Sequence, residues 1–192
     1  MSTDEVIVAD ENGVPLQVIV LVDEADRQVG YCEKQEAHRQ GLLHRAFSVI
    51  VKNDAGQILL QQRAAGKYHS PGLWSNTCCG HPRADEVVAV AARRRLDEEM
   101  GFECDLHPAR SHSYRADVGG GLIENEFVHV FFGRFKGTVT PNPLEVAAYR
   151  WFAPDALVAE VVARPEEFST WIRDYLRHFG DEIVSWSPEF DI

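Results

Sequence analysis

The sequence predicts an α/β or α+β fold, because segments typical of strands and of helices alternate along the chain. Apolar runs bounded by turn residues occur at 45–52, 57–63 and 127–132, whereas residues 86–101 combine good helix formers with an apolar face. A chain of 192 residues, 45% of them hydrophobic, has enough apolar material for one sizeable core. No repeat or low-complexity linker divides it, so a single domain spanning 1–192 is expected.

The first half of the chain is predicted to contribute three strands and a long loop. Residues 16–24, "LQVIVLVDE", are expected to form a strand that enters an acidic turn, and 27–44 a loop with at most a helical turn. The runs at 45–52 and 57–63 flank "NDAG", whose turn chemistry predicts a hairpin. Residues 66–85 are too rich in Gly, Pro, Ser and Asn for regular structure throughout, and long loops of this kind are often functional.

The second half is predicted to run from a helix through two long strands to a helical end. Residues 86–101 form the clearest helix, because a glycine closes an amphipathic pattern. Residues 113–135 are expected to form a strand, a glycine turn and a buried strand, and 148–154 a short strand that ends at a proline. Two amphipathic helices are expected at 155–164 and 165–179.

Charge and cysteine content narrow the classes of partner. The net charge of −11 argues against a nucleic-acid partner, because binding a phosphate backbone depends on concentrated Lys and Arg. A small anionic substrate would instead need a local basic cluster. Neither a leader pattern nor an apolar run of about eighteen residues is evident, so no membrane partner is expected. The four cysteines lack a disulfide-framework or zinc-site spacing, which favours a reducing, cytoplasmic setting.

Histidines and glutamates from separate segments form a candidate metal site. His38 and His44 lie in the segment predicted as irregular, and His81 lies in the glycine-rich loop. Glu124 and Glu126 would point to the same face of an extended segment, because side chains two residues apart share a face. Imidazoles and carboxylates together suit a borderline divalent metal such as Zn²⁺ or Mn²⁺. Spacing alone favours an ordinary solvated or hydrogen-bonded role for each side chain over a metal site.

A longer pattern begins at Gly80 and runs through the predicted helix. Gly80 is followed by Glu86 and then by "RRLDEEMGF" at 94–102. This spacing resembles the Nudix box, in which glutamates one helical turn apart hold Mg²⁺ against a diphosphate. Every defining position matches except Arg95, which stands where Nudix hydrolases carry a glutamate. The alternative interpretation is an exposed helix with salt bridges between residues four apart.

The arginine at this position favours binding over hydrolysis. Glu98 and Glu99 keep the capacity to hold a metal, whereas Arg95 adds a positive charge in place of a ligand. Water attack on a diphosphate therefore loses support. An arginine there suits an intact diphosphate, which it can hold by a charge-assisted fork of hydrogen bonds.

Beyond the box, the chain resembles the type I isopentenyl diphosphate isomerases of the Nudix superfamily. The shared strings are "EKQEAH", "GLLHRAFS", "QQRAAGKYHSPGLWSNTCCGHP", "RRRLDEEMG", "SYRA" and "ENE", with "FSTW" at 168–171 beyond them. The resemblance implies a Nudix fold, in which a mixed β-sheet is sandwiched between helices. It also implies reversible interconversion of isopentenyl and dimethylallyl diphosphates, and a monomer or weak dimer whose partner is this small diphosphate.

The resemblance further implies roles for individual residues. Cys79 and Glu126 would form the acid/base pair, with Tyr114 hydrogen-bonded to the carboxylate. Trp171 would place an aromatic face over the carbocation, whereas Cys78 and Trp74 are expected to serve packing.

Metal and diphosphate ligands follow from the same resemblance. The expected ligands of a Zn²⁺ or Mn²⁺ ion are His38, His44, His81, Glu124 and Glu126. Mg²⁺, bound together with the substrate diphosphate, would be held by Glu99 and by the main-chain carbonyl of Cys79. The residues expected to neutralise the diphosphate are Lys34, Arg63, Lys67 and Arg95.

Two other functions compete with the isomerase interpretation. A Nudix hydrolase that cleaves a nucleoside diphosphate or another diphosphate would need the glutamate that Arg95 replaces, and it gives no reason for Cys79. A non-catalytic domain that binds a metal or a diphosphate would not need Cys79, Tyr114 and Glu126 together. The sequence shows no DNA-binding motif at the N-terminus that would favour such a regulator.

Overall fold

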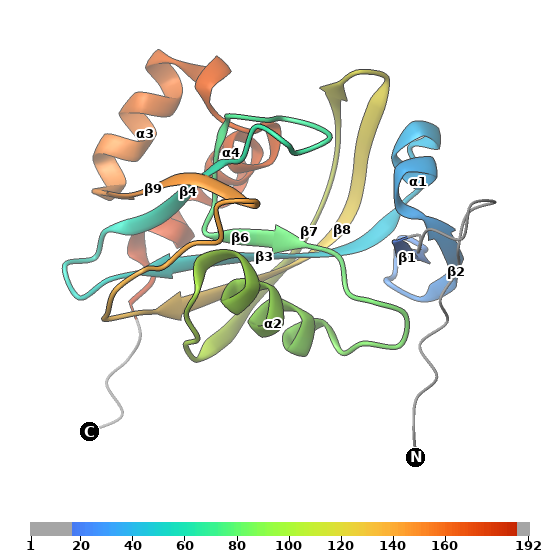
Figure 1. Cartoon of the computed structure of the whole chain (residues 1–192), viewed down its shortest axis with the longest axis horizontal. Helices are drawn as coiled ribbons and strands as arrows, with labels where there is room; N and C mark the ends of the chain where they lie inside the picture. Colours follow the sequence, from blue (N-terminus) through green and yellow to red (C-terminus); the bar gives the residue numbers. More distant parts are fainter. Residues whose placement is uncertain (1–16, 188–192) are drawn as a thin grey trace.

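The strands of this protein form one mixed sheet (Figure 1), seen in a computed structural model that describes residues 17–187. Strand β3 (His44–Lys52) lies at its centre, pairing in parallel with β8 (Leu122–Arg134) and antiparallel with β6 (Cys78–Gly80). The other strands are β1 (Val18–Val22), β2 (Gln28–Glu33), β4 (Ile58–Arg63), β5 (Trp74–Ser75), β7 (Leu106–Gly119) and β9 (Val146–Phe152). Because β3 pairs with β1, β6 and β8, chemistry-bearing segments from distant parts of the chain meet beside it.

Helices cover both faces of the sheet, which confirms the predicted sandwich. Alternate residues of β3 point to opposite faces, so both faces must be covered. Ala46 and Ile50 belong to the core that α4 (Thr170–Ser185) covers. Phe47 and Val49 belong to the core that α2 (Val88–Met100) covers. The helix α3 (Pro154–Ala163) packs beside α4 and is joined to it by a 3-10 turn, Pro165–Glu167.

The segment 27–44 is more regular than predicted, and this corrects the expected loop. It contains β2, the edge strand of the sheet, followed directly by α1 (Lys34–Gln40). The side chain of Glu33 accepts hydrogen bonds from the main-chain N–H groups of Gln35 and Glu36, which caps the start of this short helix. At its end, Gly41 adopts a left-handed conformation. His38 and His44 therefore lie on a helix and a strand.

The predicted hairpin between β3 and β4 is confirmed at its turn, but the two strands separate beyond it. Only Lys52 and Ile58 are paired. The side chain of Thr77 fills the space between the strands, because its Oγ1 accepts from Val51 N and donates to the Leu59 carbonyl. The glycine-rich loop 66–85, predicted to lack continuous regular structure, thus contributes the short strands β5 and β6 to the sheet.

Several predicted boundaries shift because tertiary contacts set them. Helix α2 begins at Val88, since the carboxylate of Glu86 instead accepts from Arg83 N and from the Arg94 guanidinium. The helix predicted at 165–179 divides: Ser169 N donates to the Trp74 carbonyl, so the chain is extended there and α4 starts one residue later. Strand β7 begins at Leu106, ahead of the predicted 113, because it pairs with β8 throughout.

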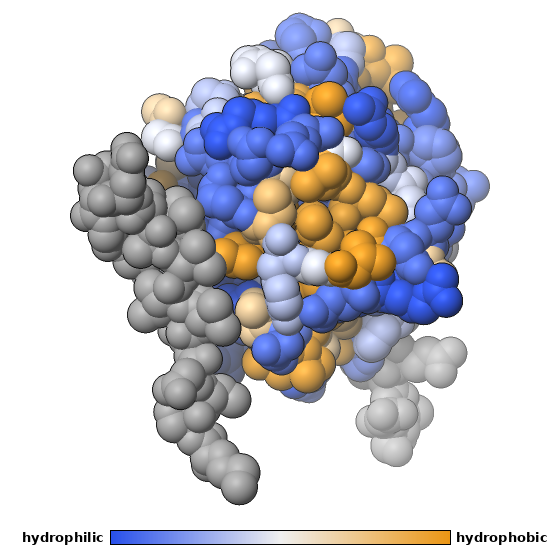
Figure 2. Space-filling view, turned by 90° about the vertical axis from the view of Figure 1, so that its right-hand side faces the viewer, coloured by the Kyte–Doolittle hydropathy of each residue, from blue (hydrophilic) through white to orange (hydrophobic). Residues whose placement is uncertain are grey.

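The side of the molecule formed by β1, β2 and α1 exposes apolar atoms between hydrophilic margins (Figure 2). In the edge strand β2, Val29 and Tyr31 are among the exposed large hydrophobic residues. Across residues 17–187, none of the helices has both the length and the apolar character required to cross a membrane. Leu16, where the first strand was predicted to start, lies outside the described residues.

Candidate active site

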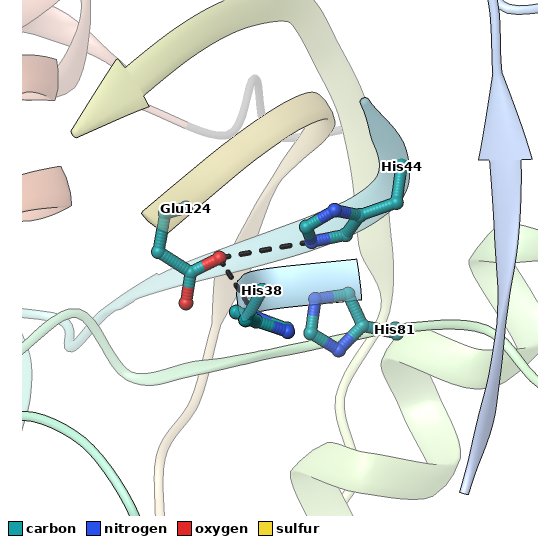
Figure 3. A group of neighbouring side chains, drawn as sticks. All are labelled: His38, His44, His81 and Glu124. Atoms are coloured by element: carbon teal, nitrogen blue, oxygen red, sulfur yellow. Dashed lines mark ion pairs between the residues drawn. The ribbon is translucent and has the colours of Figure 1, made fainter. Parts of the chain in front are cut away.

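Three histidines and a glutamate from four different elements converge beside β3 (Figure 3). His38 comes from α1, His44 begins β3, His81 follows β6, and Glu124 lies in β8. The ring centroid of His44 lies 4.8 Å from that of His38 and 4.9 Å from that of His81. Glu124 Oε2 lies 3.1 Å from His38 Nε2 and 3.7 Å from His44 Nε2. The structure therefore brings together side chains that the sequence separates by more than eighty positions.

Glu126 lies on the same face of β8 as Glu124, as the alternation predicted. Its Oε1 lies 3.0 Å from His81 Nε2, and its Oε2 accepts a 2.7 Å hydrogen bond from the Tyr114 hydroxyl. The intervening Asn125 points elsewhere, because its side-chain amide donates to the Gly41 carbonyl. Both glutamates lie inside the strand and are buried.

Hydrogen bonds fix the tautomers of two of the histidines. His38 Nδ1 lies 2.5 Å from the Lys34 carbonyl, and His44 Nδ1 lies 2.8 Å from the Leu42 carbonyl. A carbonyl oxygen only accepts, so each Nδ1 carries the proton and each Nε2 offers a lone pair. Metal-binding histidines in proteins are commonly oriented in this way.

The donor atoms fit a divalent cation. Among the described residues, buried His44 Nε2 and buried Glu124 Oε2 have no hydrogen-bond partner. Ligand atoms of His38, His44, His81 and Glu124 all lie within 4.8 Å of one another. In the neutral ring, the lone pair of His44 Nε2 faces Glu124 Oε2 across 3.7 Å with no hydrogen bond between them, which favours a cation in that space.

Electrostatics within the cluster are dominated by the two carboxylates. Burial alone would lower the pKa of His44, but the Glu124 and Glu126 carboxylates, each 3.7 Å from its Nε2, outweigh it and raise the pKa to about 9. Burial lowers the pKa of His81 to about 4 despite its bond to Glu126. Burial opposes ionisation of Glu124, yet the neighbouring imidazoles of His38, His44 and His69 hold its pKa well below the usual range. The carboxylates thus supply the negative charge that a cation would neutralise.

Cys79 and Cys78 face opposite sides of the sheet. Cys78 is fully buried in the core under α2, which confirms its predicted packing role. Cys79, opposite Ser48 of β3, is partly buried and packs against the core that α4 covers. Burial raises the pKa of the Cys79 thiol to about 12, with the Arg63 charge opposing. The charge of Glu126 also raises it, so the two groups predicted as an acid/base pair act on one another.

Trp171 is held at the start of α4 by two hydrogen bonds to the glycine-rich loop. Its indole Nε1 donates to Ser75 Oγ at 2.7 Å and to Asn76 Oδ1 at 3.0 Å. The Arg63 guanidinium lies 5.2 Å from the ring centroid. Trp74 instead packs against Phe152 in the core, in agreement with its predicted packing role.

Four cations predicted to bind the diphosphate lie near one another. Burial lowers the pKa of Lys34, and the charges of Lys67, Arg95 and Arg63 lower it further. Groups that perturb each other in this way share one electropositive region of an acidic protein. The sequence analysis missed Glu145, which pairs with Lys67 and lies 3.5 Å from Arg95.

The Nudix-box helix turns its two glutamates in different directions. Glu99 is buried, accepts from Gln61 Nε2 at 2.8 Å and pairs with Arg95. Glu98 is more exposed and pairs with Arg94 and Arg95. Glu99 is therefore the glutamate that faces the interior.

His69 is a second residue that the sequence analysis missed. Its Nε2 lies 3.1 Å from Glu124 Oε1, and its ring meets Trp171 edge-on with centroids 5.7 Å apart. Burial lowers its pKa. The signals in the sequence were its place inside the loop 66–85, of a kind that is often functional, and inside the shared string "QQRAAGKYHSPGLWSNTCCGHP".

Comparison with known proteins first defines the class. The NUDIX domain family model matches residues 42–178. The crystal structure of DR0079 from Deinococcus radiodurans superposes with a TM-score of 0.70, covering 83% of this chain and 97% of that one. The sequence identity in that pair is 22%, so the likeness concerns the fold. Fold and sequence pattern together define a NUDIX-domain protein.

Named relatives then specify the family. An isopentenyl-diphosphate Delta-isomerase of Burkholderia multivorans is 53% identical over 166 residues, covering 86% of this chain and 94% of the relative. Isopentenyl-diphosphate Delta-isomerase 2 of Aromatoleum aromaticum is 52% identical over 167 residues, covering 87% and 86%. The chain belongs to the isopentenyl-diphosphate Delta-isomerase family of NUDIX-domain proteins.

Proposed function

We propose that this protein interconverts isopentenyl diphosphate and dimethylallyl diphosphate by a proton shift across the alkene. The observation that carries the proposal lies beside β3, where Tyr114 is hydrogen-bonded to Glu126 and the charge of Glu126 acts on the Cys79 thiol. The relatives of the chain are named isopentenyl-diphosphate Delta-isomerases. A hydrolase would use the diphosphate site but has no need of this buried thiol and carboxylate. The Arg95–Glu99 pair in the Nudix-box helix also favours retention of an intact diphosphate.

The proposed reaction divides two proton transfers between Cys79 and Glu126. One group adds a proton to the terminal alkene carbon, which leaves a tertiary carbocation at the next carbon. The other group removes a proton from the carbon beyond it, and the electron pair of that C–H bond becomes the new double bond. The protein pair gains one proton and loses one, so its total is unchanged.

The surroundings of the pair suit this chemistry. With its pKa raised to about 12, the Cys79 thiol is neutral at physiological pH. Burial and the Glu124 charge oppose ionisation of Glu126, but the neighbouring imidazoles of His44 and His81 outweigh them and lower its pKa. One member of the pair therefore starts with a proton and the other without. The Tyr114 hydroxyl, whose own pKa burial raises well above its usual range, holds Glu126 as a hydrogen-bond donor.

Trp171 would present its aromatic face to the carbocation. Its two hydrogen bonds fix the indole edge, and its face would stabilise a carbocation by about 0.5–2 kcal/mol. Lys34, Arg63, Lys67 and Arg95 would hold the diphosphate, which keeps the hydrocarbon end oriented toward Cys79 and Glu126.

Two divalent cations belong to the proposal. Zn²⁺ or Mn²⁺ would be held by His38, His44, His81, Glu124 and Glu126, and Mg²⁺ by Glu99, the Cys79 carbonyl and the substrate diphosphate. Such cations supply fixed positive charge beside the carboxylates and the diphosphate. The protein is further proposed to act in the cytoplasm as a monomer or weak dimer without a membrane partner. A nucleic-acid partner is not proposed either, because the net charge is −11.

Deuterium exchange tests the proton shift directly. Purified protein is incubated with isopentenyl diphosphate and Mg²⁺ in deuterated water, and label entering dimethylallyl diphosphate is followed by NMR. We expect label in the product for the intact protein and none for Cys79→Ala.

Cys78→Ala is the matched control, because it deletes the neighbouring thiol on the other face of the sheet and should leave exchange in place. Metal content is measured in every sample. If the metal-loaded protein shows no exchange but releases phosphate from a panel of other diphosphates, the proposed isomerase activity is wrong and the protein is a hydrolase.

A further inference from the structure

His69 contacts the carboxylate oxygen of Glu124 that pairs with neither His38 nor His44. The two carboxylate oxygens of Glu124 have separate surroundings: Oε2 faces His38 and His44, whereas Oε1 lies 3.1 Å from His69 Nε2. A carboxylate with one unrestrained oxygen can rotate about its terminal bond. A donor at Oε1 would stop that rotation and keep Oε2 directed at the histidines.

The tautomer of His69 permits it to be this donor. Its Nδ1 lies 3.3 Å from the hydroxyl of Ser70, which can donate. With Nδ1 as the acceptor, the proton of a neutral ring lies on Nε2 and points to Glu124 Oε1. Both ring nitrogens of this buried side chain are then satisfied.

His69 is itself held from two sides. The Arg63 guanidinium donates to its carbonyl at 3.1 Å, which fixes the backbone. The Trp171 ring meets the imidazole at an interplanar angle of 81°, and the Tyr68 ring meets it at 90°. The imidazole therefore has little freedom to leave Glu124, and its position depends on the loop between β4 and β5 and on α4.

We propose that His69 is a positioning residue that orients Glu124 for cation binding by a hydrogen bond to Oε1. This inference rests on the proposed role of Glu124 as a metal ligand. His69 Nε2 contacts Glu124 Oε1, the oxygen that does not pair with His38 or His44, so its action goes through Glu124. Outer partners of this kind typically change metal affinity by about 10- to 100-fold.

A pair of variants isolates the hydrogen bond. His69→Gln and His69→Met introduce unbranched side chains of similar length, and both remove the ring, but only glutamine can donate to Glu124. The affinity of the purified metal-free proteins for Zn²⁺ is measured by competition with a chromophoric chelator, and thermal unfolding is followed in parallel. We expect His69→Met to bind Zn²⁺ about 10- to 100-fold more weakly than the wild type, and His69→Gln to stay within a few-fold of it.

A second measurement separates positioning from a purely structural role. The kcat of His69→Met for isopentenyl diphosphate should be low at limiting Zn²⁺ and rise toward the wild-type value at saturating Zn²⁺, with KM unchanged. Equal Zn²⁺ affinity of the two variants would overturn the proposal, even if both unfold at a lower temperature.

His44→Ala, which removes a proposed direct ligand, shows whether the underlying metal site exists. If His44→Ala binds Zn²⁺ as tightly as the wild type, the ligand assignment fails and the role of His69 fails with it. If His44→Ala loses Zn²⁺ binding while His69→Met keeps it, only the role of His69 fails.

Discussion

Replacing Gly101 with alanine is expected to destabilise the protein through two separate effects. Gly101 ends α2 in a left-handed conformation, with φ 71° and ψ 31°. A Cβ added there would lie 2.1 Å from the Thr140 carbonyl oxygen. The same segment caps the helix, because Thr140 N donates to the Met100 carbonyl and Asn142 N to the Glu99 carbonyl. The side chain therefore cannot be accommodated without moving the groups that close the Nudix-box helix.

The size of the effect follows from adding the two costs. A left-handed conformation costs a non-glycine residue about 1–2 kcal/mol. Overpacking against a fixed carbonyl adds about 1–3 kcal/mol. Gly101→Ala should then lose about 2–5 kcal/mol of unfolding free energy, which is a large share of the total stability of a typical domain.

Gly56→Ala is the matched control that measures the cost of the left-handed conformation alone. Gly56 has φ 73°, and a Cβ there would meet no atom within 4 Å. It should therefore lose only about 1–2 kcal/mol. Both variants are compared with the wild type by thermal and urea unfolding, where each kcal/mol corresponds to about 2–4 °C in Tm for a chain of this size. Equal losses in the two variants would refute the steric part of the reasoning, because only Gly101 faces a carbonyl.

Three further changes test the site and its support. Tyr114→Phe removes a hydrogen bond to the charged Glu126, and such a bond contributes about 1.5–3 kcal/mol. The kcat should therefore fall about 10- to 150-fold with little change in KM, and an unchanged kcat would contradict this role. Because burial raises the pKa of Cys79 to about 12 from an ordinary 9.0, the unfolded chain loses this proton first as the pH rises. The stability that the neutral thiol contributes is thus complete below pH 9 and lost between pH 9 and 12. The free energy of unfolding measured with urea should therefore fall more steeply over that range for the wild type than for Cys79→Ala. Lys52→Met removes two 2.8 Å hydrogen bonds to carbonyls at the end of α4. It should lower the free energy of unfolding, measured with urea, by about 1–3 kcal/mol. An unchanged midpoint would show that water satisfies these carbonyls in place of the ammonium group.

Local patterns in the sequence were enough to predict the secondary structure where a segment determines its own conformation. The helix ending at Gly101 and the turn in "NDAG" depend on neighbouring residues, and both are present in the structure. Segments that depend on distant partners were predicted less well. Within residues 17–187, strand β2 pairs only with β1. The break before α4 reflects a hydrogen bond from Ser169 to Trp74, ninety-five positions earlier in the chain. Propensity within a short window carries no information about such partners.

The sequence by itself determined which chemical groups this protein possesses. The alternation of Glu124 with Glu126, the Nudix-box spacing and the arginine at position 95 are properties of the chain that no folding event changes. Only the tertiary structure decided how those groups are used. Parallel pairing of β3 with β8 places His44 opposite Glu126, and the charges that face each other there shift the pKa of each group against the effect of burial. The contact between His69 and Glu124 likewise joins residues fifty-five positions apart, because distances across a sheet depend on strand register and bear no relation to separation along the chain.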